Sequence, residues 1–170
     1  MRRITVIRHA KSSWADPAHN DEHRPLNERG KENAPIMGDR LAAQGMNPDL
    51  LLSSPAIRAF ETAKVIAGKV GYPTGSIHPD ERLYLAGIEQ WFEVIRTLPE
   101  DARHVFCFGH NPGLTHLYNI FSPNPVENIP TCGMFDLAFE VNGWEDLAQA
   151  RPKTVKYDYP KSEGIEKVLG

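Results

Sequence analysis

The sequence predicts an α/β fold of three layers, in which a mostly parallel sheet is flanked by helices. Three runs of almost continuous apolar or β-forming residues have the length of buried strands: 4–7 (ITVI), 49–54 (DLLLSS) and 104–109 (HVFCFG). Each run is followed, directly or after a loop, by a segment whose apolar residues recur at helical spacing. Strands that are apolar throughout and alternate with helices are typical of a parallel sheet covered on both faces.

The first predicted helix begins at Asn27, whose side chain is a suitable N-cap, and ends at Gly45. Pro35 lies inside this helix and lacks the N–H group that a helix interior requires. We therefore expect a kink or a new helix start near Asn33.

The remaining helices follow the second and third strands. One has Ser54 as its N-cap and Pro55 as its first residue, and it extends to Gly71. Another has an apolar face within 91–98, and a further helix opens on proline and glycine within 111–121. These helices complete the predicted alternation of strand and helix.

The last third of the chain has a different pattern. Residues 135–141 (FDLAFEV) alternate with period two and end in Asn142-Gly143, which predicts a β-hairpin. The final 20 residues are polar and interrupted by proline, so we expect an edge element or a partly loose tail. No repeat or linker divides the chain, which predicts a single domain over residues 1–170.

Composition and charge exclude several classes of protein. The chain carries 19 basic and 22 acidic residues, a net charge of −3, which argues against a nucleic-acid or anionic-membrane surface. No apolar stretch approaches the ~20 residues that span a bilayer. Two cysteines are too few for a disulfide scaffold, and the N-terminal apolar run is too short for a signal peptide. We therefore expect a cytoplasmic protein, and the sequence makes no prediction of its oligomeric state.

Cationic residues follow each of the three buried strands. Arg8 and His9 end the first strand, Arg58 lies shortly after the second, and His110 follows the third. The carboxyl ends of parallel strands meet at one edge of a sheet, so these side chains should converge there. Such a cluster needs an anion, and guanidinium groups match phosphate oxygens bidentately. The sequence thus predicts a phosphoryl site that requires no metal or other cofactor, because the arginines supply the positive charge.

Five motifs that contain these residues are similar to those of one known family. RHA at 8–10, LNERG at 26–30, SSPAIRAFETA at 53–63, ERLYLAG at 81–87 and GHNPGL at 109–114 occur in that order. Together they resemble the histidine phosphatase superfamily, and within it the short SixA-like phosphohistidine phosphatases. The resemblance implies a phosphoglycerate mutase-like fold, a mostly parallel sheet flanked by helices.

The resemblance also implies roles for the site residues. His9 matches the histidine that becomes phosphorylated, Arg8 and Arg58 match the arginines that clamp the phosphate, and His110 matches the second pocket histidine, which we expect to be protonated. Ser12 stands where many relatives have a serine or threonine at the pocket edge. Flanking cations disfavour protonation of His9, which would leave its imidazole a nucleophile.

The sequence departs from relatives that hydrolyse alcohol esters, which usually carry a glutamate as general acid. In the corresponding stretch stand Tyr84 and Leu85, and Glu81 is the nearest candidate acid. An imidazole leaving group needs much less help from an acid than an alkoxide does. We therefore expect a phosphohistidine-bearing signalling or phosphotransfer protein as substrate. The alternatives are a small-metabolite phosphomonoesterase that uses Glu81, and a phosphoprotein-binding module without turnover.

The loop after the first strand also invites a metal-site interpretation. His19 and His23 are four residues apart with carboxylates nearby, but such a pair chelates well only on a helix, which this loop is not expected to form. We expect instead a mobile rim loop that contacts a phosphoprotein. Trp14, Trp91 and Trp144 are alternatives for substrate platforms, but we expect them to pack in the core or against the hairpin.

Overall fold

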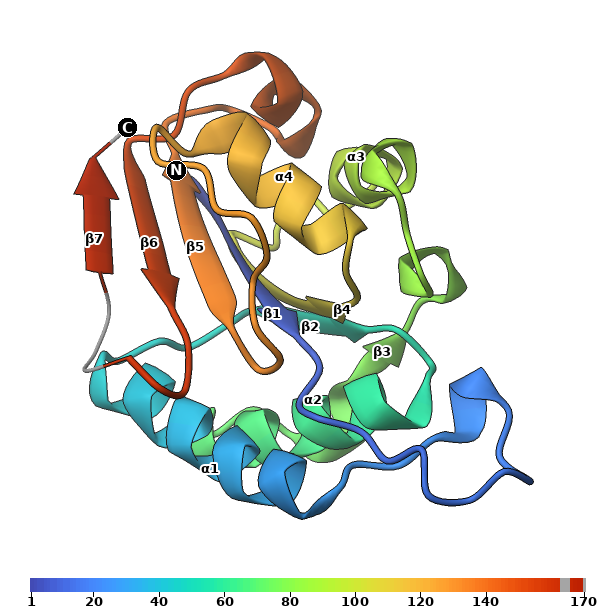
Figure 1. The fold of residues 1–170 in the computed structure, drawn as a ribbon. Helices are drawn as coiled ribbons and strands as arrows, with labels where there is room; N and C mark the ends of the chain where they lie inside the picture. The colour runs from blue at the N-terminus through green and yellow to red at the C-terminus, as the bar shows by residue number, and fades with distance from the viewer. Residues whose placement is uncertain (163–165, 170) are drawn as a thin grey trace.

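The computed structural model describes residues 1–162 and 166–169, and within them the strands form one seven-stranded sheet in the order β3-β2-β4-β1-β5-β6-β7 (Figure 1). The strands are β1 Arg2–Arg8, β2 Leu50–Ser53, β3 His78–Pro79, β4 His104–Gly109, β5 Met134–Phe139, β6 Thr154–Asp158 and β7 Glu166–Leu169. Strands β1 to β4 are parallel, and β5 to β7 are added antiparallel. The predicted α/β class is confirmed, with a mixed sheet.

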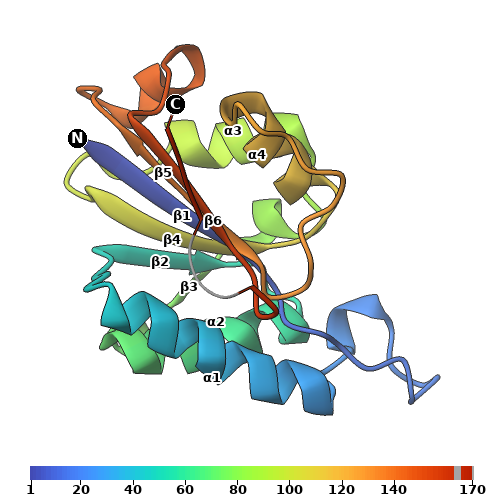
Figure 2. The ribbon, with the colours of Figure 1, turned by 60° about the vertical axis from the view of Figure 1, so that its left-hand side comes forward.

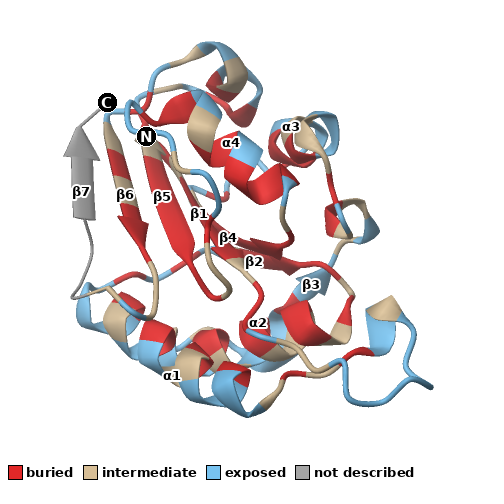
Figure 3. Cartoon of the chain, viewed as in Figure 1, coloured by how far each residue is buried: buried red, intermediate tan, exposed pale blue. Residues whose placement is uncertain are grey.

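Helices cover both faces of this sheet. They are α1 Glu28–Ala43, α2 Ile57–Val70, α3 Ile88–Arg96 and α4 Gly113–Phe121. Figures 1 and 2 show α1 and α2 on one face and α3 and α4 on the other. Alternate residues of β4 serve the two cores, Phe106 and Phe108 on the α1–α2 side and Val105 and Cys107 on the α3–α4 side. This two-sided burial, red in Figure 3, explains why the strand is apolar throughout.

Helix α1 begins as predicted but is not interrupted. The Asn27 side chain accepts a hydrogen bond from the Gly30 N–H, and Gly45 follows the helix at φ 71°, in the left-handed region that favours glycine. The expected new start near Asn33 is wrong, because α1 continues through Pro35. Proline removes one helical hydrogen bond there, and the flanking turns carry the helix across it.

Helix α2 begins later than predicted. Its first residue is Ile57, so Ser54 and Pro55 lie in the preceding turn. The Ser54 hydroxyl accepts from the Ala56 N–H and lies 2.7 Å from Nε2 of His110. The serine that looked like a helix cap therefore supports the second histidine of the site.

The predicted hairpin after β5 is wrong. A long connection with a 3₁₀ helix, η4 Trp144–Gln149, separates β5 from β6. Trp144 is fully buried, and its indole N–H donates to the Ala102 carbonyl over 2.8 Å. Because Trp144 is buried, the connection between β5 and β6 packs against the core. A two-residue turn after β5 would be too short to bury this side chain.

The C-terminal segment contributes more to the sheet than expected. Strand β6 lies inside the sheet, and β7 forms the edge. Asp158 at the end of β6 is buried and accepts from Arg40 of α1 over 3.1 Å. The segment after β6 is therefore held against α1.

Strand register brings the predicted site residues to one edge. Arg8 pairs with Gly109 across β1 and β4, so the next residues, His9 and His110, leave the sheet side by side. A Cβ at Gly109 would lie 2.7 Å from the Trp91 ring, closer than packing allows. The absence of a side chain there lets Trp91 of α3 pack directly under the strand end.

Candidate active site

His9 and His110 form the centre of the site. Their ring centroids lie 5.3 Å apart, and both side chains are buried. The His9 N–H donates to the Gly109 carbonyl over 3.1 Å, which joins the two strand ends just beyond the ladder. The convergence predicted from parallel strands is therefore found in the structure.

The hydrogen bonding of His9 leaves one ring nitrogen available. Nδ1 lies 2.7 Å from the Ala10 carbonyl oxygen, which only accepts, so Nδ1 carries the hydrogen and Nε2 carries the lone pair. Burial, followed by the charges of Arg58, Arg8 and Arg24, lowers the pKa of His9 to about 3. His9 is thus a neutral imidazole at pH 7, on the wall of a cavity of about 360 Å³.

His110 is held by two partners. Nδ1 lies 3.4 Å from Nη2 of Arg58 and Nε2 lies 2.7 Å from Oγ of Ser54. Guanidinium only donates, so Nδ1 accepts and the ring hydrogen is on Nε2. Burial, His9 and Arg58 lower the pKa of His110 to about 3. In the site without a bound anion His110 is therefore neutral, because burial and the cations around it disfavour a further positive charge, and its protonation with a phosphoryl group bound stays a prediction.

The two predicted arginines line the same cavity in different ways. Arg58 donates from Nη1 to the Asp21 carbonyl over 2.6 Å and from Nη2 to the Asp21 carboxylate over 2.9 Å. Arg8 donates from Nη1 to the Ile129 carbonyl over 2.8 Å and forms no ion pair within the described residues. Burial and the nearby Arg58 lower the pKa of Arg8.

Both guanidinium groups have spare hydrogen-bonding capacity. The Nε atoms of Arg8 and Arg58 are buried and have no hydrogen-bond partner among the described residues. A buried donor without a partner is costly unless a ligand supplies the acceptor. The two arginines are thus suited to an oxyanion beside His9.

A third arginine was not found from the sequence. Arg24 is buried, donates to Ser12 Oγ over 2.9 Å and lies 3.1 Å from the Asp21 carboxylate. Its guanidinium carbon is 3.4 Å from the Trp14 ring centroid. The only sequence signal for Arg24 was its place in a charged loop, which does not distinguish a buried cation from a solvated one.

Trp14 and Ser12 belong to the edge of the cavity. Ser12 lines it, as the resemblance implied. Trp14 is 75% exposed, so the expectation that it packs in the core is wrong, because its ring stacks on Arg24 instead.

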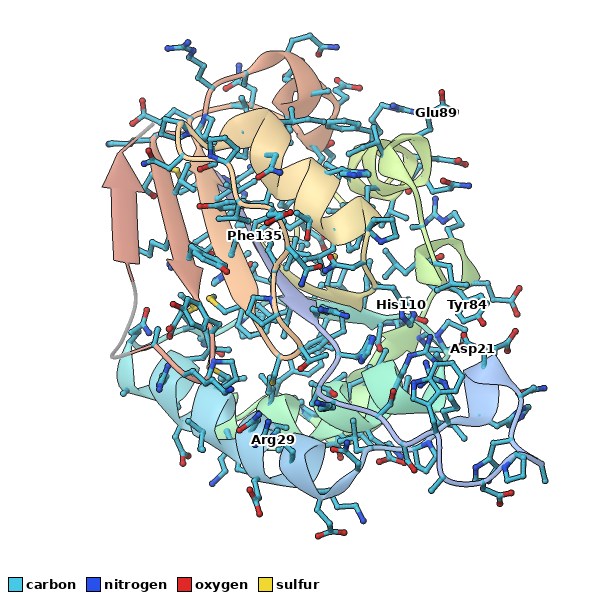
Figure 4. All side chains as sticks on the ribbon, in the orientation of Figure 1. Asp21, Arg29, Tyr84, Glu89, His110 and Phe135 are labelled. Atoms are coloured by element: carbon cyan, nitrogen blue, oxygen red, sulfur yellow. The ribbon has the colours of Figure 1, made fainter. Side chains whose placement is uncertain are left out.

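Asp21 is the single carboxylate among the described residues that line the cavity. It lies in the short 3₁₀ helix η1, Asp21–His23. Figure 4 shows Asp21 beside Tyr84 and His110, and the Tyr84 hydroxyl donates to the Asp21 carboxylate. Burial opposes ionisation, but hydrogen bonds from Tyr84 and Arg58 outweigh it and lower the pKa of Asp21 to about 2. Asp21 therefore holds no proton to donate at neutral pH.

Glu81, the candidate acid, is not part of the cavity wall. It lies in the turn η3, Glu81–Leu83, where its side chain is exposed. Leu85 lines the cavity instead, with φ of 49°. The alternative in which Glu81 serves as the acid is therefore not supported by the structure, because η3 ends before the chain turns toward the cavity.

The loop histidines have local partners. His19 lies 3.7 Å from Asp16, and His23 hydrogen-bonds to Asn20. Throughout the described part of the chain, no three His, Cys, Asp or Glu side chains are grouped as metal ligands. Nor does any helix in residues 1–162 or 166–169 have the length and apolar character to cross a membrane.

Comparisons with known proteins agree with this geometry. Residues 4–91 match the family model of the histidine phosphatase superfamily, branch 1. An uncharacterized chloroplastic protein of Arabidopsis thaliana is 31% identical over 153 residues, which cover 85% of this chain and 70% of that protein. A mitochondrial serine/threonine-protein phosphatase, Pgam5 of Drosophila pseudoobscura pseudoobscura, is 36% identical over 76 residues, 45% of this chain and only 26% of the relative's length.

A solved structure extends the similarity over most of the fold. The crystal structure of a protein from Agrobacterium tumefaciens, assigned as the phosphohistidine phosphatase SixA, superposes with a TM-score of 0.72 at 30% identity. The match covers 80% of this chain and 90% of that one. The chain is therefore a SixA-like member of the histidine phosphatase superfamily, and its activity is that of a phosphatase.

Proposed function

We propose that this phosphatase hydrolyses phosphohistidine carried on a protein. The observation that supports this most directly is the absence, among the described residues of the cavity wall, of a protonated carboxyl group that could act as general acid. Its single carboxylate, Asp21, has a pKa of about 2, while neutral His9 lies among three arginines. Such a site is suited to a substrate whose leaving group needs no proton from a carboxylic acid of the enzyme.

The first step is attack by His9. The Nε2 lone pair forms a bond to phosphorus, and the bond from phosphorus to the substrate imidazole breaks. The substrate imidazole first takes a proton from solvent on its other ring nitrogen, so it keeps the bonding electron pair and departs as a neutral ring. Since imidazole has a pKa near 6.5, this departure is far easier than that of an alkoxide.

The second step is hydrolysis of phospho-His9. Water attacks phosphorus, the bond to Nε2 breaks with its electrons returning to the ring, and the water proton passes to solvent. The products are inorganic phosphate and neutral His9. The Ala10 carbonyl keeps the hydrogen on Nδ1 throughout, so Nε2 is ready for the next cycle.

The remaining residues stabilise the transferring phosphoryl group. Arg8 and Arg58 bind its equatorial oxygens, where negative charge spreads in the transition state. A bound phosphoryl dianion also raises the pKa of His110, which then binds an oxygen as a cation. Ser12 orients Arg24 at the cavity edge. No metal or other cofactor takes part in this scheme.

A protein substrate fits the exposed rim of the cavity. Trp14 and Leu85 are more than half exposed and line the opening, where they present apolar surface to a partner. We place the enzyme in the cytoplasm, since both cysteines are buried and unpaired, as expected in a reducing compartment.

The competing function is hydrolysis of phosphoserine or phosphothreonine, which the similarity to Pgam5 favours. Two peptides of one sequence, carrying phosphohistidine or phosphoserine at the same position, separate the two. We expect kcat/KM to be at least ~10²-fold higher for phosphohistidine, because the alkoxide of serine lacks an acid. Equal values would assign the protein to ester hydrolysis.

Two variants complete this test. His9→Ala should abolish turnover of both peptides, and binding of the phosphopeptide without turnover by the intact protein would identify a binding module instead. Glu81→Gln should leave ester hydrolysis unchanged, with Glu89→Gln as the matched exposed control. A loss specific to Glu81→Gln would restore Glu81 as the acid and a metabolite phosphatase as the function.

A further inference from the structure

A second cavity adjoins the active site and is lined by cations. It has a volume of about 220 Å³, and Lys11, Arg29 and Lys161 lie on its wall. Lys11 and Thr131 line both this cavity and the active-site cavity, so the two are neighbours that share a wall. Among the described residues no carboxylate lines the second cavity. We call it the basic groove.

The cations of the basic groove lack the partners found elsewhere. Some exposed cations elsewhere lie close to carboxylates, as Lys69 does to Asp39 and Lys153 to Glu140, whereas others such as Arg96 have no ion pair among the described residues. Within the described residues, the side chains of Lys11, Arg29 and Lys161 form no ion pair or hydrogen bond. On a chain with a net charge of −3, three such cations in one groove form a local positive patch.

Backbone packing fixes two walls of the groove. The Lys11 carbonyl accepts from the Asn27 N–H over 2.9 Å, and a Cβ on Gly30 would lie 2.2 Å from that oxygen. Glycine at position 30 thus lets the first turn of α1 lie against the exit of β1. This contact places Arg29 next to Lys11, and Figure 4 shows Arg29 on α1, away from the group of Asp21, Tyr84 and His110.

Arg40 fixes the third wall. Its guanidinium donates to the carbonyls of Tyr159, Pro160 and Ser162 over 3.0 to 3.1 Å. These bonds fasten the segment after β6 to α1. Lys161 is therefore presented from a fixed backbone rather than from a free tail.

We propose that the basic groove binds acidic side chains that flank the phosphohistidine on the partner protein. This inference rests on the proposed function. A phosphoryl group in the active-site cavity would leave neighbouring residues of the same chain next to the groove, because the cavities share a wall. Exposed carboxylates facing three unpaired cations mainly increase the association rate and the selection among partners.

Two phosphohistidine peptides that differ only in their flanking residues, three glutamates or three glutamines, test this. We expect kcat/KM at low ionic strength to be ~5-fold or more higher for the glutamate peptide. The ratio should fall to about 1 in the variant R29E/K161E, and with added salt. The control R96E/R151E reverses two other exposed arginines, changes the net charge equally and should keep the ratio. A ratio near 1 in the intact protein, or one that survives R29E/K161E, would overturn the proposal.

Failure of the proposed function gives a different result, which is no turnover of either peptide. Binding of the unphosphorylated peptides, labelled with fluorescein and measured by fluorescence anisotropy, then tests the groove separately. Saturating inorganic phosphate is present so that the active-site cations are occupied. Tighter binding of the glutamate peptide that is lost in R29E/K161E supports the groove. Equal binding of the two peptides rejects it.

Discussion

Two clusters of arginine and histidine, one in the sheet and one in the active site, differ in how their charge is balanced. In the sheet, Asp136 is fully buried and accepts from Arg3 and from the Thr5 hydroxyl, at 2.9 Å and 2.6 Å. His104 Nε2 lies 2.9 Å from the same hydroxyl, and burial lowers the pKa of His104 to about 4. One arginine, one carboxylate and one neutral histidine leave no net charge.

The active site contains the same residue types without that balance. Arg8, Arg24 and Arg58 face the one carboxylate of Asp21 in the described part of the cavity wall. Two buried Nε donors there have no partner among the described residues, whereas Arg3 uses its Nε on Asp136. A cluster whose positive and negative charges balance can serve the fold alone, whereas a cluster with excess positive charge can bind an anion. The difference identifies the functional cluster more reliably than the presence of histidine does.

Replacement of one histidine in each cluster should give the largest contrast. His9→Ala should lower kcat/KM for phosphohistidine peptide by at least about 10³-fold, because the nucleophile is lost. His104→Gln should retain kcat/KM per folded molecule, measured with the folded fraction determined by circular dichroism. Similar losses in both variants would show that the clusters are not functionally distinct.

Removal of one charge from each cluster should act in opposite ways. Arg8→Met should lower kcat/KM by about 10²- to 10³-fold and leave the free energy of unfolding unchanged or higher, because Arg8 has no carboxylate partner. Asp136→Ala should lower that free energy by about 3 kcal/mol and leave kcat/KM per folded molecule unchanged. Urea denaturation and steady-state kinetics measure both, and a strongly destabilised Arg8→Met protein would contradict the comparison.

Acid should destabilise the protein through both clusters. The pKa values of His9 and His110 are lowered to about 3 and that of His104 to about 4, so the unfolded chain binds more protons below pH 6.5. Stability from these histidines is complete above that pH and decreases as the pH falls, toward about 4 for His104 and toward about 3 for His9 and His110. At pH 5 each should contribute up to about 2 kcal/mol less than at pH 7, as urea denaturation would measure.

Bound phosphate should affect the histidine pKa values of the two clusters differently. Saturating inorganic phosphate should raise the pKa of His9 and His110, because a nearby anion favours the imidazolium, and leave that of His104 in place. ¹⁵N-edited NMR of the imidazoles follows each site. Unchanged values for all three histidines would argue against an anion between the pocket pair.

Removal of the pocket carboxylate should have the smallest effect. Asp21→Asn frees donors on Arg58 and Arg24, so inorganic phosphate should bind about 10-fold more tightly. Glu22→Gln, which alters the adjacent exposed carboxylate, should leave the affinity unchanged. Calorimetric titration measures both, and weaker binding by Asp21→Asn would mean that Asp21 chiefly orients Arg58.

Much of the fold and the centre of the site could be predicted because their signals are local. The strand runs that end in Arg8-His9 and Gly109-His110 are continuous in sequence, and parallel pairing brings such ends together whatever the exact strand order. The boundary of α2 and the hairpin after β5 could not be predicted. The Ser54 hydroxyl hydrogen-bonds to His110 instead of capping α2, and Trp144 is buried against the core instead of lying in a tight turn. Both contacts join parts of the chain that are distant in sequence.

The sequence alone predicted the class of fold, His9 as the candidate nucleophile and the residues that accompany it at the strand ends. The folded structure was needed to show that Arg24 and Asp21 line the cavity and that Glu81 does not. It also decided that both pocket histidines are neutral, because their pKa values depend on burial and on cations from three separate segments. Periodicity and the residues at strand ends can be read from short stretches of sequence. The charge balance around a side chain depends on residues that are distant in sequence and become neighbours only in the folded chain.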